Sequence, residues 1–211
     1  MQYIAVEGVI GVGKTTLTKR LADFVGGYRV LEVVEENPFL PDFYRDRRAY
    51  GFQTQIFFLL SRYRQQKKML QRDLFHGPVI SDYMFEKDRI FANINLDDAE
   101  LDMYNQVFSL MERDLPKPDR IIYLMATVDQ LLERIAMRGR EFERNMDPAY
   151  LETLAEAYNY FFGHYSGAPV MVVNTGEVDF SRDLSLVSDL WRALAGQRTG
   201  RAMFVPGETL A

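Results

Sequence analysis

The sequence predicts an α/β fold in which a five-stranded parallel sheet is covered by helices on both faces. Five short runs are nearly continuous in Val, Ile and Leu, as expected of strands buried on both sides. Between these runs, apolar residues recur at intervals of three and four, as expected of helices. A glycine-rich loop joins the first run to the first helical segment. The alternation of strand and helix predicts that the sheet is parallel.

The strands and helices follow each other in order along the chain. After the first strand, a stripe of Leu17, Leu21 and Phe24 predicts a helix, which Gly26 and Gly27 end. Another stripe, which begins at Leu101, predicts a helix over about 98–114. The expected strands cover residues 3–6, 30–34, 79–81, 121–125 and 170–173.

Capping residues mark the ends of the later helices. Thr127 and Gln130 have the spacing of a capping box, and Gly139 marks the end of the helix that they begin. Asp147, which precedes a proline, predicts the start of the next helix. Ser181 is the expected cap of the last helix.

The length of 211 residues fits one domain, which we place at 1–195, followed by a loose tail at 196–211. The absence of cysteine excludes thiol catalysis, Cys-based zinc sites and a disulfide scaffold. A net charge of −5 argues against a nucleic-acid partner. No segment approaches the roughly 20 apolar residues of a membrane span, and the N-terminus does not resemble a signal peptide. We therefore expect a cytoplasmic protein without a membrane partner.

Residues 8–15 match the complete phosphate-loop motif G-x-x-x-x-G-K-[ST] between a predicted strand and a predicted helix. Glycines let backbone N–H groups point at phosphate oxygens, and the helix N-terminus adds partial positive charge. Lys14 can reach the outer phosphates, and the Thr15 hydroxyl can coordinate Mg²⁺. A glycine-rich turn with a stray lysine is the disfavoured alternative. The expected ATP phosphate-binding residues are Gly8, Gly11, Val12, Gly13, Lys14, Thr15, Thr16 and Arg134.

An acid and a group of arginines add to this site. Asp82 ends an apolar strand, where phosphate-loop enzymes place the carboxylate that orients Mg²⁺, although Asp is also a common turn residue. Four arginines crowd into residues 134–144, and Arg134 and Arg138 share a helix face. We expect an arginine-rich lid at about 138–147 that closes over the triphosphate. The alternative is a solvated helix end, where cations suit the helix dipole.

The second strand leads to a group of acids at the ligand-binding edge of the sheet. Glu32 lies at the end of that strand, with Glu35 and Glu36 just beyond it. A hydroxyl is a poor nucleophile and needs such a carboxylate to accept its proton. Gln55 and Arg62 are seven residues apart, so they project from one face of a helix. The Gln55 amide can both donate and accept hydrogen bonds to the edge of a nucleobase.

In these motifs the sequence resembles the deoxynucleoside kinase family, over residues 3 to about 194. The segments EENPFL at 35–40, LPKP at 115–118 and RGR at 138–140 look closest to the bacterial deoxyadenosine and deoxyguanosine kinases. The resemblance implies a phosphate-loop kinase fold, with Mg²⁺ and ATP, that phosphorylates the 5′-hydroxyl of a deoxynucleoside. It favours a purine deoxynucleoside, without deciding between guanine and adenine.

The resemblance also implies roles for individual residues. Glu32 corresponds to the general base, with Glu35 and Glu36 as rivals for that place. Lys14, Arg138 and Arg140 correspond to the other catalytic residues. The expected substrate-binding residues are Glu32, Tyr44, Gln55, Arg62, Asp88 and Glu143, of which Tyr44 and Glu143 hold the sugar 3′-hydroxyl and Arg62 and Asp88 pair beside the base. Asp179 and Phe180 correspond to the adenine-contacting loop, and Thr15 and Asp82 to the metal site.

One position departs from the family pattern. The acid-Arg-Ser motif reads Asp82-Tyr83-Met84 here, so the arginine that approaches the phosphates is missing and Tyr83 cannot replace its charge. Either a lid arginine compensates, or the chain belongs to a subgroup in which tyrosine is usual.

Two other functions remain possible from the sequence. A nucleoside monophosphate kinase shares the fold and the lid, but a carboxylate such as Glu32 would repel its acceptor. A nucleotide-binding regulatory subunit is the second alternative. The resemblance further suggests a homodimer, or a heterodimer with a related kinase subunit, through the helices at 50–70 and 98–114.

Overall fold

A computed structural model describes residues 3–70 and 77–207 of the chain. The strands form one sheet in the order β2-β3-β1-β4-β5-β6, and every neighbouring pair is parallel. The α/β fold with a parallel sheet is therefore confirmed, but the expected five strands are six. The strands are β1 (Tyr3–Gly8), β2 (Tyr28–Val30), β3 (Val79–Ser81), β4 (Arg120–Met125), β5 (Val170–Asn174) and β6 (Arg201–Met203).

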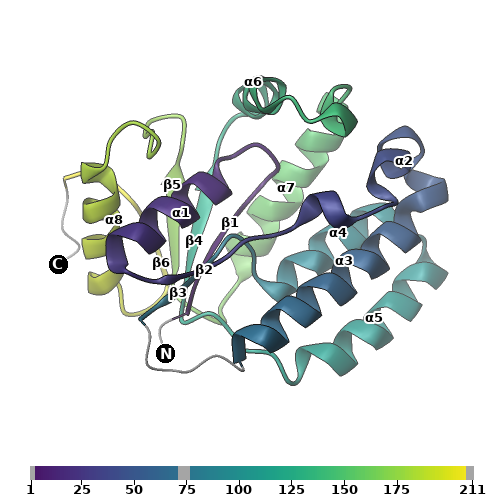
Figure 1. The fold of residues 1–211 in the computed structure, drawn as a ribbon, viewed down its shortest axis with the longest axis horizontal. Coiled ribbons are helices and arrows are strands. Elements are labelled where there is room, and N and C mark those ends of the chain that lie inside the picture. Colours follow the sequence, from purple (N-terminus) through teal and green to yellow (C-terminus); the bar gives the residue numbers. More distant parts are fainter. Residues whose placement is uncertain (1–2, 71–76, 208–211) are drawn as a thin grey trace.

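Helices cover both faces of the sheet. α1 and α8 pack together on one side, while α3, α4, α5 and α7 lie on the other side (Figure 1). The α-helices are α1 (Lys14–Val25), α2 (Leu40–Arg45), α3 (Arg47–Leu70), α4 (Asp88–Asn95), α5 (Asp98–Glu112), α6 (Val128–Arg138), α7 (Pro148–His164) and α8 (Ser185–Gly196). Short 3₁₀ turns are η1 (Val34–Glu36), η2 (Phe85–Lys87) and η3 (Glu141–Glu143). Within the described ranges, no helix has both the length and the apolar character needed to span a bilayer.

Local capping signals set most helix ends. The capping box of Thr127 and Gln130 forms at the start of α6, and Gly139 ends that helix with a φ of 69°. The Asp147 side chain accepts a hydrogen bond from the first turn of α7, as expected. The prediction for Ser181 is wrong, because α8 begins at Ser185 and Ser181 instead donates to the side chain of Asp179.

The segment after α8 is not a loose tail. Residues 201–203 form β6, which pairs with β5, and the buried ring of Phe204 lies 6.3 Å from that of Phe180. Residues 208–211 of the expected tail lie outside the described part of the chain. The prediction missed this strand because β6 is a short edge strand with exposed Arg201 and Met203.

The apolar core has two parts. The larger part fills both faces of the central strands, where β1 and β4 are almost fully buried. A smaller part lies between α3, η2, α4 and α5, and it includes Leu59, Phe85, Tyr104 and Phe108. Because η2 connects β3 to α4, this smaller core fixes the chain just beyond the carboxyl end of β3.

Candidate active site

The phosphate loop leads from β1 into α1 through three glycines with positive φ. Gly8, Gly11 and Gly13 have φ of 147°, 87° and 104°, values that favour glycine. A Cβ on Gly8 would also lie 2.5 Å from the carbonyl oxygen of Leu124 in β4. The Lys14 Nζ donates to the Gly8 carbonyl at 2.7 Å, so the lysine lies back across the loop. The loop therefore has the curled shape that the motif predicts.

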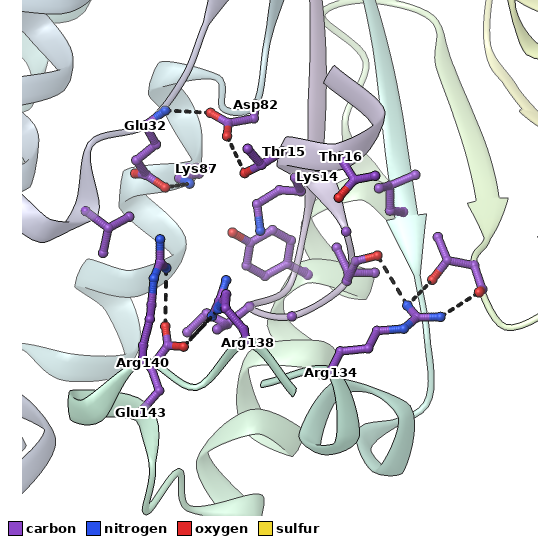
Figure 2. A pocket seen from close by; sticks show the side chains of 18 of the residues that line it. Lys14, Thr15, Thr16, Glu32, Asp82, Lys87, Arg134, Arg138, Arg140 and Glu143 are labelled. Carbon is purple, nitrogen blue, oxygen red and sulfur yellow. Dashed lines mark hydrogen bonds and ion pairs between the residues drawn. The ribbon is translucent and has the colours of Figure 1, made fainter. Parts of the chain in front are cut away.

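Asp82 joins this loop to the chain that follows β2. Its Oδ2 accepts a hydrogen bond from the Thr15 hydroxyl at 2.7 Å, and its Oδ1 accepts one from the Glu32 backbone N–H at 2.7 Å (Figure 2). Burial, together with the charge of Glu32, raises the pKa of Asp82 above its usual value. Asp82 thus fixes the backbone of Glu32 against the first turn of α1.

The oxygens of Thr15 and Asp82 fit a magnesium ion that is shared with a nucleotide. Mg²⁺ prefers oxygen ligands, keeps several waters and commonly binds through one or two protein groups plus substrate phosphates. Among the described residues, no group of three or more His, Asp or Glu side chains could hold a metal ion by itself. The phosphates and waters would therefore have to complete the shell.

Glu32 lies two residues beyond β2, where two cations hold its carboxylate. Its Oε1 accepts from Arg62 Nε at 2.8 Å and from Arg62 Nη2 at 2.5 Å, and its Oε2 accepts from Lys87 Nζ at 2.8 Å. Burial acts to raise the pKa of Glu32, but the charges of Arg62 and Lys87 outweigh it and hold the pKa well below the usual range. Glu32 is therefore a carboxylate at neutral pH, with both oxygens fixed in direction.

Arg62 also forms an ion pair with Asp88, as the family resemblance implies. Asp88 is fully buried at the start of α4, and its Oδ2 accepts a hydrogen bond from the Tyr104 hydroxyl at 3.0 Å. The guanidinium of Arg62 lies 4.7 Å from the ring centroid of Phe58. Arg62 thus connects α3 to the start of α4 and to Glu32.

A cavity of about 900 Å³ is lined by Glu32, Arg62 and Lys87, together with the phosphate loop, whereas the predicted site residue Asp88 lies behind Arg62 and does not line it. Gln55 lines it, and its buried Oε1 has no hydrogen-bond partner among residues 3–70 and 77–207. Tyr44 and Glu143 line the same cavity, and burial and the Glu143 charge raise the pKa of Tyr44 above its usual value. Of the three candidate acids, Glu32 lines the cavity and the exposed Glu35 and Glu36 do not.

The lid residues lie opposite Glu32 across the cavity. The buried Glu143 accepts from Arg138 Nη2 at 2.5 Å and pairs with Arg140 Nη1 at 3.5 Å (Figure 2). Arg140 also pairs with Glu35. Both arginines line the cavity. The lid therefore presents two cations, which share the carboxylate of Glu143, to the space between the phosphate loop and Glu32.

Arg134 and the loop after β5 form the far end of the cavity. Arg134 Nη1 donates to the Thr175 hydroxyl at 2.7 Å and to the Val12 carbonyl at 3.3 Å, so it joins this loop to the phosphate loop (Figure 2). Asp179 and Phe180 also line the cavity. The ring of Phe180 lies beside the buried ring of Phe204, just after β6, on which it packs.

The sequence analysis missed three residues of the site. Lys87 is the second cation on Glu32, and the hydroxyl of Thr175 anchors Arg134. Glu7, fully buried in β1, accepts a hydrogen bond from the Met84 N–H at 2.6 Å, and burial raises its pKa to about 7. A charged residue inside an apolar strand just before a phosphate loop was a signal for Glu7. The cation missing at Tyr83 was the signal for Lys87.

Comparisons with known proteins agree with this geometry. A family model described as deoxynucleoside kinase matches residues 4–194. A deoxyguanosine kinase of Bacillus subtilis (strain 168) is 40% identical over 186 residues, which are 87% of this chain and 89% of the relative. A deoxyadenosine/deoxycytidine kinase of the same organism is 32% identical, over 89% of this chain and 88% of the relative. The solved structure of deoxyadenosine kinase from M. mycoides with bound dATP superposes with a TM-score of 0.78 at 27% identity, over 90% of this chain and 99% of that one.

Proposed function

Because the chain belongs to the deoxynucleoside kinase family and is a deoxynucleoside kinase, we propose that it transfers the γ-phosphoryl group of ATP to the 5′-hydroxyl of a purine deoxynucleoside. The observation that carries the proposal is the position of Glu32. Its carboxylate lines the cavity, is tied through Asp82 to the phosphate loop, and is held by two cations. Deoxyguanosine or deoxyadenosine is the proposed acceptor.

In the proposed reaction the 5′-oxygen forms a bond to the γ-phosphorus. The bond from that phosphorus to the β–γ bridging oxygen breaks, and ADP leaves with the bonding pair. The hydroxyl proton passes to the Glu32 carboxylate. A carboxylate with a lowered pKa is a weak base, but phosphoryl transfer is loose, so the proton can move late. The main work of Glu32 is then to orient the hydroxyl in line with the phosphorus.

The donor side is served by the phosphate loop and the lid. Lys14 and the loop amides are placed to bind the outer phosphates, and Arg138 and Arg140 to neutralise charge on the transferring group. Thr15 and Asp82 would hold Mg²⁺, which would supply positive charge to offset that of the phosphates. Arg134 joins the phosphate loop to the loop after β5. We assign Asp179 and Phe180 of that loop to the adenine of ATP.

The acceptor side is served by α2, α3 and α4. The free Oε1 of Gln55 can accept from an exocyclic amine or a ring N–H of the base, and its amide nitrogen can donate to a neighbouring acceptor. Tyr44 and Glu143 are placed for the sugar 3′-hydroxyl. The names of both relatives include a purine deoxynucleoside, deoxyguanosine in one and deoxyadenosine in the other, although the second also names deoxycytidine. They support a purine acceptor without choosing between guanine and adenine.

A monophosphate kinase is a weaker candidate. Its acceptor carries a phosphate where Glu32 lies, and a carboxylate with both oxygens already held would repel that phosphate. A regulatory subunit without activity is not consistent with the family assignment.

Association into a homodimer, or a heterodimer with a related subunit, stays a prediction. The proposed helices, α3 and α5, pack against each other, and Met103 and Leu110 of α5 expose 51% and 69% of their surface. A cytoplasmic location also stays a prediction. Light scattering of the purified protein, alone and after mixing with a related kinase subunit, tests the association.

An ADP-release assay with Mg-ATP tests the proposed function. The panel contains the four common deoxynucleosides and their monophosphates. We expect turnover on purine deoxynucleosides, a loss of at least about 100-fold in kcat for Glu32→Gln, and little change for the exposed control Glu36→Gln. Turnover on monophosphates would refute the proposed acceptor. Turnover restricted to pyrimidine deoxynucleosides would refute the purine assignment.

A further inference from the structure

Lys87 is a buried cation that faces the active-site cavity, and the assignments above give it no role beyond holding Glu32. It ends η2, its side chain is 3% exposed, and it lines the cavity. The preceding Phe85 stacks on Phe108 of α5 with 4.9 Å between ring centroids. The smaller core therefore fixes the turn that contains Lys87. This holds the Lys87 ammonium against Glu32.

Tyr83, which stands where the family motif has arginine, does not line the cavity. Tyr83 is fully buried, and its hydroxyl donates to the side chain of Gln65 at 2.7 Å. The Lys87 Nζ lies 5.8 Å from the centroid of the Tyr83 ring. No charge therefore reaches the cavity from position 83, and a cation reaches it from four residues further along the chain.

Within the four ion-paired residues Glu32, Asp88, Arg62 and Lys87, the charges balance only when Lys87 is counted. Glu32 and Asp88 carry two negative charges, and Arg62 and Lys87 carry two positive charges. Without Lys87 this buried group would carry a net negative charge beside the phosphates. Such a charge is costly in a buried site and repels a phosphoryl group. Lys87 thus offsets the negative charge of this carboxylate where it lines the cavity.

The ammonium of Lys87 also has N–H donors that Glu32 does not use. It has three N–H groups, and within the described residues Glu32 Oε2 is the one hydrogen-bond acceptor recorded for it. Glu32 Oε1 is already occupied by two bonds from Arg62. Figure 2 shows Lys87 on the side of the cavity where Glu32 lies, with Lys14 at the phosphate loop beyond it. The remaining donors are therefore available to a ligand oxygen between the two lysines.

We propose that Lys87 is a catalytic residue, whose ammonium holds Glu32 Oε2 and donates to the phosphoryl group as it moves between ATP and the acceptor hydroxyl. This inference rests on the proposed function. Lys87 then supplies, from η2, the positive charge that Tyr83 does not supply. The contact strengthens as negative charge gathers on the transferring oxygens, so it acts on kcat more than on substrate binding.

The test compares Lys87→Met and Lys87→Arg with the wild-type protein and with Lys67→Met, a control at a half-exposed lysine of α3 that pairs with Asp114 outside the cavity. We expect Lys87→Met to lower kcat about 100- to 1,000-fold, with the deoxynucleoside dissociation constant within about threefold of wild type. Lys87→Arg should recover at least tenfold of the lost kcat, and Lys67→Met should match wild type. In Lys87→Ala, added ethylamine should restore turnover in a saturable manner.

Several results would overturn the inference. A kcat for Lys87→Met within threefold of wild type would do so. An equal loss of kcat and of deoxynucleoside binding that arginine does not recover would show a structural role instead. If Lys87→Met melts below the assay temperature, Lys87→Gln replaces it, and equal turnover of the Gln and Arg variants counts against the proposal. Failure of the wild-type protein on every deoxynucleoside refutes the proposed function, whereas an active wild type with an active Lys87→Met refutes this inference alone.

Discussion

Tyr104→Phe removes one buried oxygen that stabilises the centre of the site. The Tyr104 hydroxyl donates to Asp88 Oδ2 at 3.0 Å, and both residues are fully buried. Phenylalanine keeps the ring and its contacts, so the change isolates one hydrogen bond to a charged acceptor. Such bonds contribute about 1.5–3 kcal/mol, against about 1 kcal/mol for a bond between neutral groups.

For a protein of this length, that loss should lower Tm by about 3–12 °C. The matched control is Tyr123→Phe, whose buried hydroxyl donates to the neutral amide oxygen of Asn159 at 2.7 Å. Its expected cost is about 1 kcal/mol. Thermal and urea unfolding of the three proteins at pH 7 measure the difference.

The two variants should also differ in activity. Asp88 pairs with Arg62, which in turn holds Glu32, so Tyr104→Phe should raise the KM for the deoxynucleoside several-fold. The control variant lies outside this network and should leave the KM unchanged. A Tyr104→Phe protein no less stable than the control, with an unchanged KM, would refute the reasoning that the hydroxyl positions Asp88.

Three further predictions concern the donor side. Phe204→Ala removes the ring that packs on Phe180, so it should lower the free energy of unfolding by about 3–5 kcal/mol. It should also raise the KM for ATP more than that for the deoxynucleoside, and equal changes in the two KM values would contradict this. Burial, with nearby positive charge, lowers the pKa of Lys14 to about 8, so kcat/KM for ATP should fall as pH rises through that value; a flat profile up to pH 10 would contradict it. Gly8 has a positive φ, and in Gly8→Ala the new Cβ would lie 2.5 Å from a backbone carbonyl oxygen, so ATP binding measured by calorimetry should be lost. In the control Gly163→Ala the new Cβ meets nothing within 4 Å, and this variant should bind ATP normally.

The parts of the fold that depend on local chemistry could be predicted from the sequence. The phosphate loop needs glycine because its backbone enters positive φ, and that need is visible in the motif. The capping box at Thr127 is local in the same way. The residue at which α8 begins could not be identified from the local sequence. Asp179 accepts from Ser181 and Asp183 accepts from Ser185 in the same pattern, and tertiary packing selects the second.

The missing parts of the site depend on contacts between distant residues. Lys87 looks like an ordinary solvated lysine until η2 packs against α5 and buries its side chain beside Glu32. Thr175 likewise meets Arg134, 41 residues earlier, only in the folded chain. The resemblance placed Arg62 and Asp88 together, and the structure confirms that contact as an ion pair. It did not indicate that Arg62 also binds Glu32.

This double role of Arg62 couples the proposed recognition of the base to the chemistry. One guanidinium bonds both to Asp88, which we propose acts beside the base, and to Oε1 of Glu32, which we propose orients the acceptor hydroxyl. Asp88 is fully buried and does not line the cavity, so a base would reach it through Arg62. A base that shifts Arg62 should therefore also disturb Glu32, because a rigid planar fork cannot turn towards one partner without leaving the other. Lys87 holds the opposite oxygen of Glu32 from a separate turn and does not contact Asp88. Changes at Asp88 should consequently alter both KM and kcat, whereas changes at Lys87 should act on kcat alone, and this contrast separates selection of the base from transfer of the phosphoryl group.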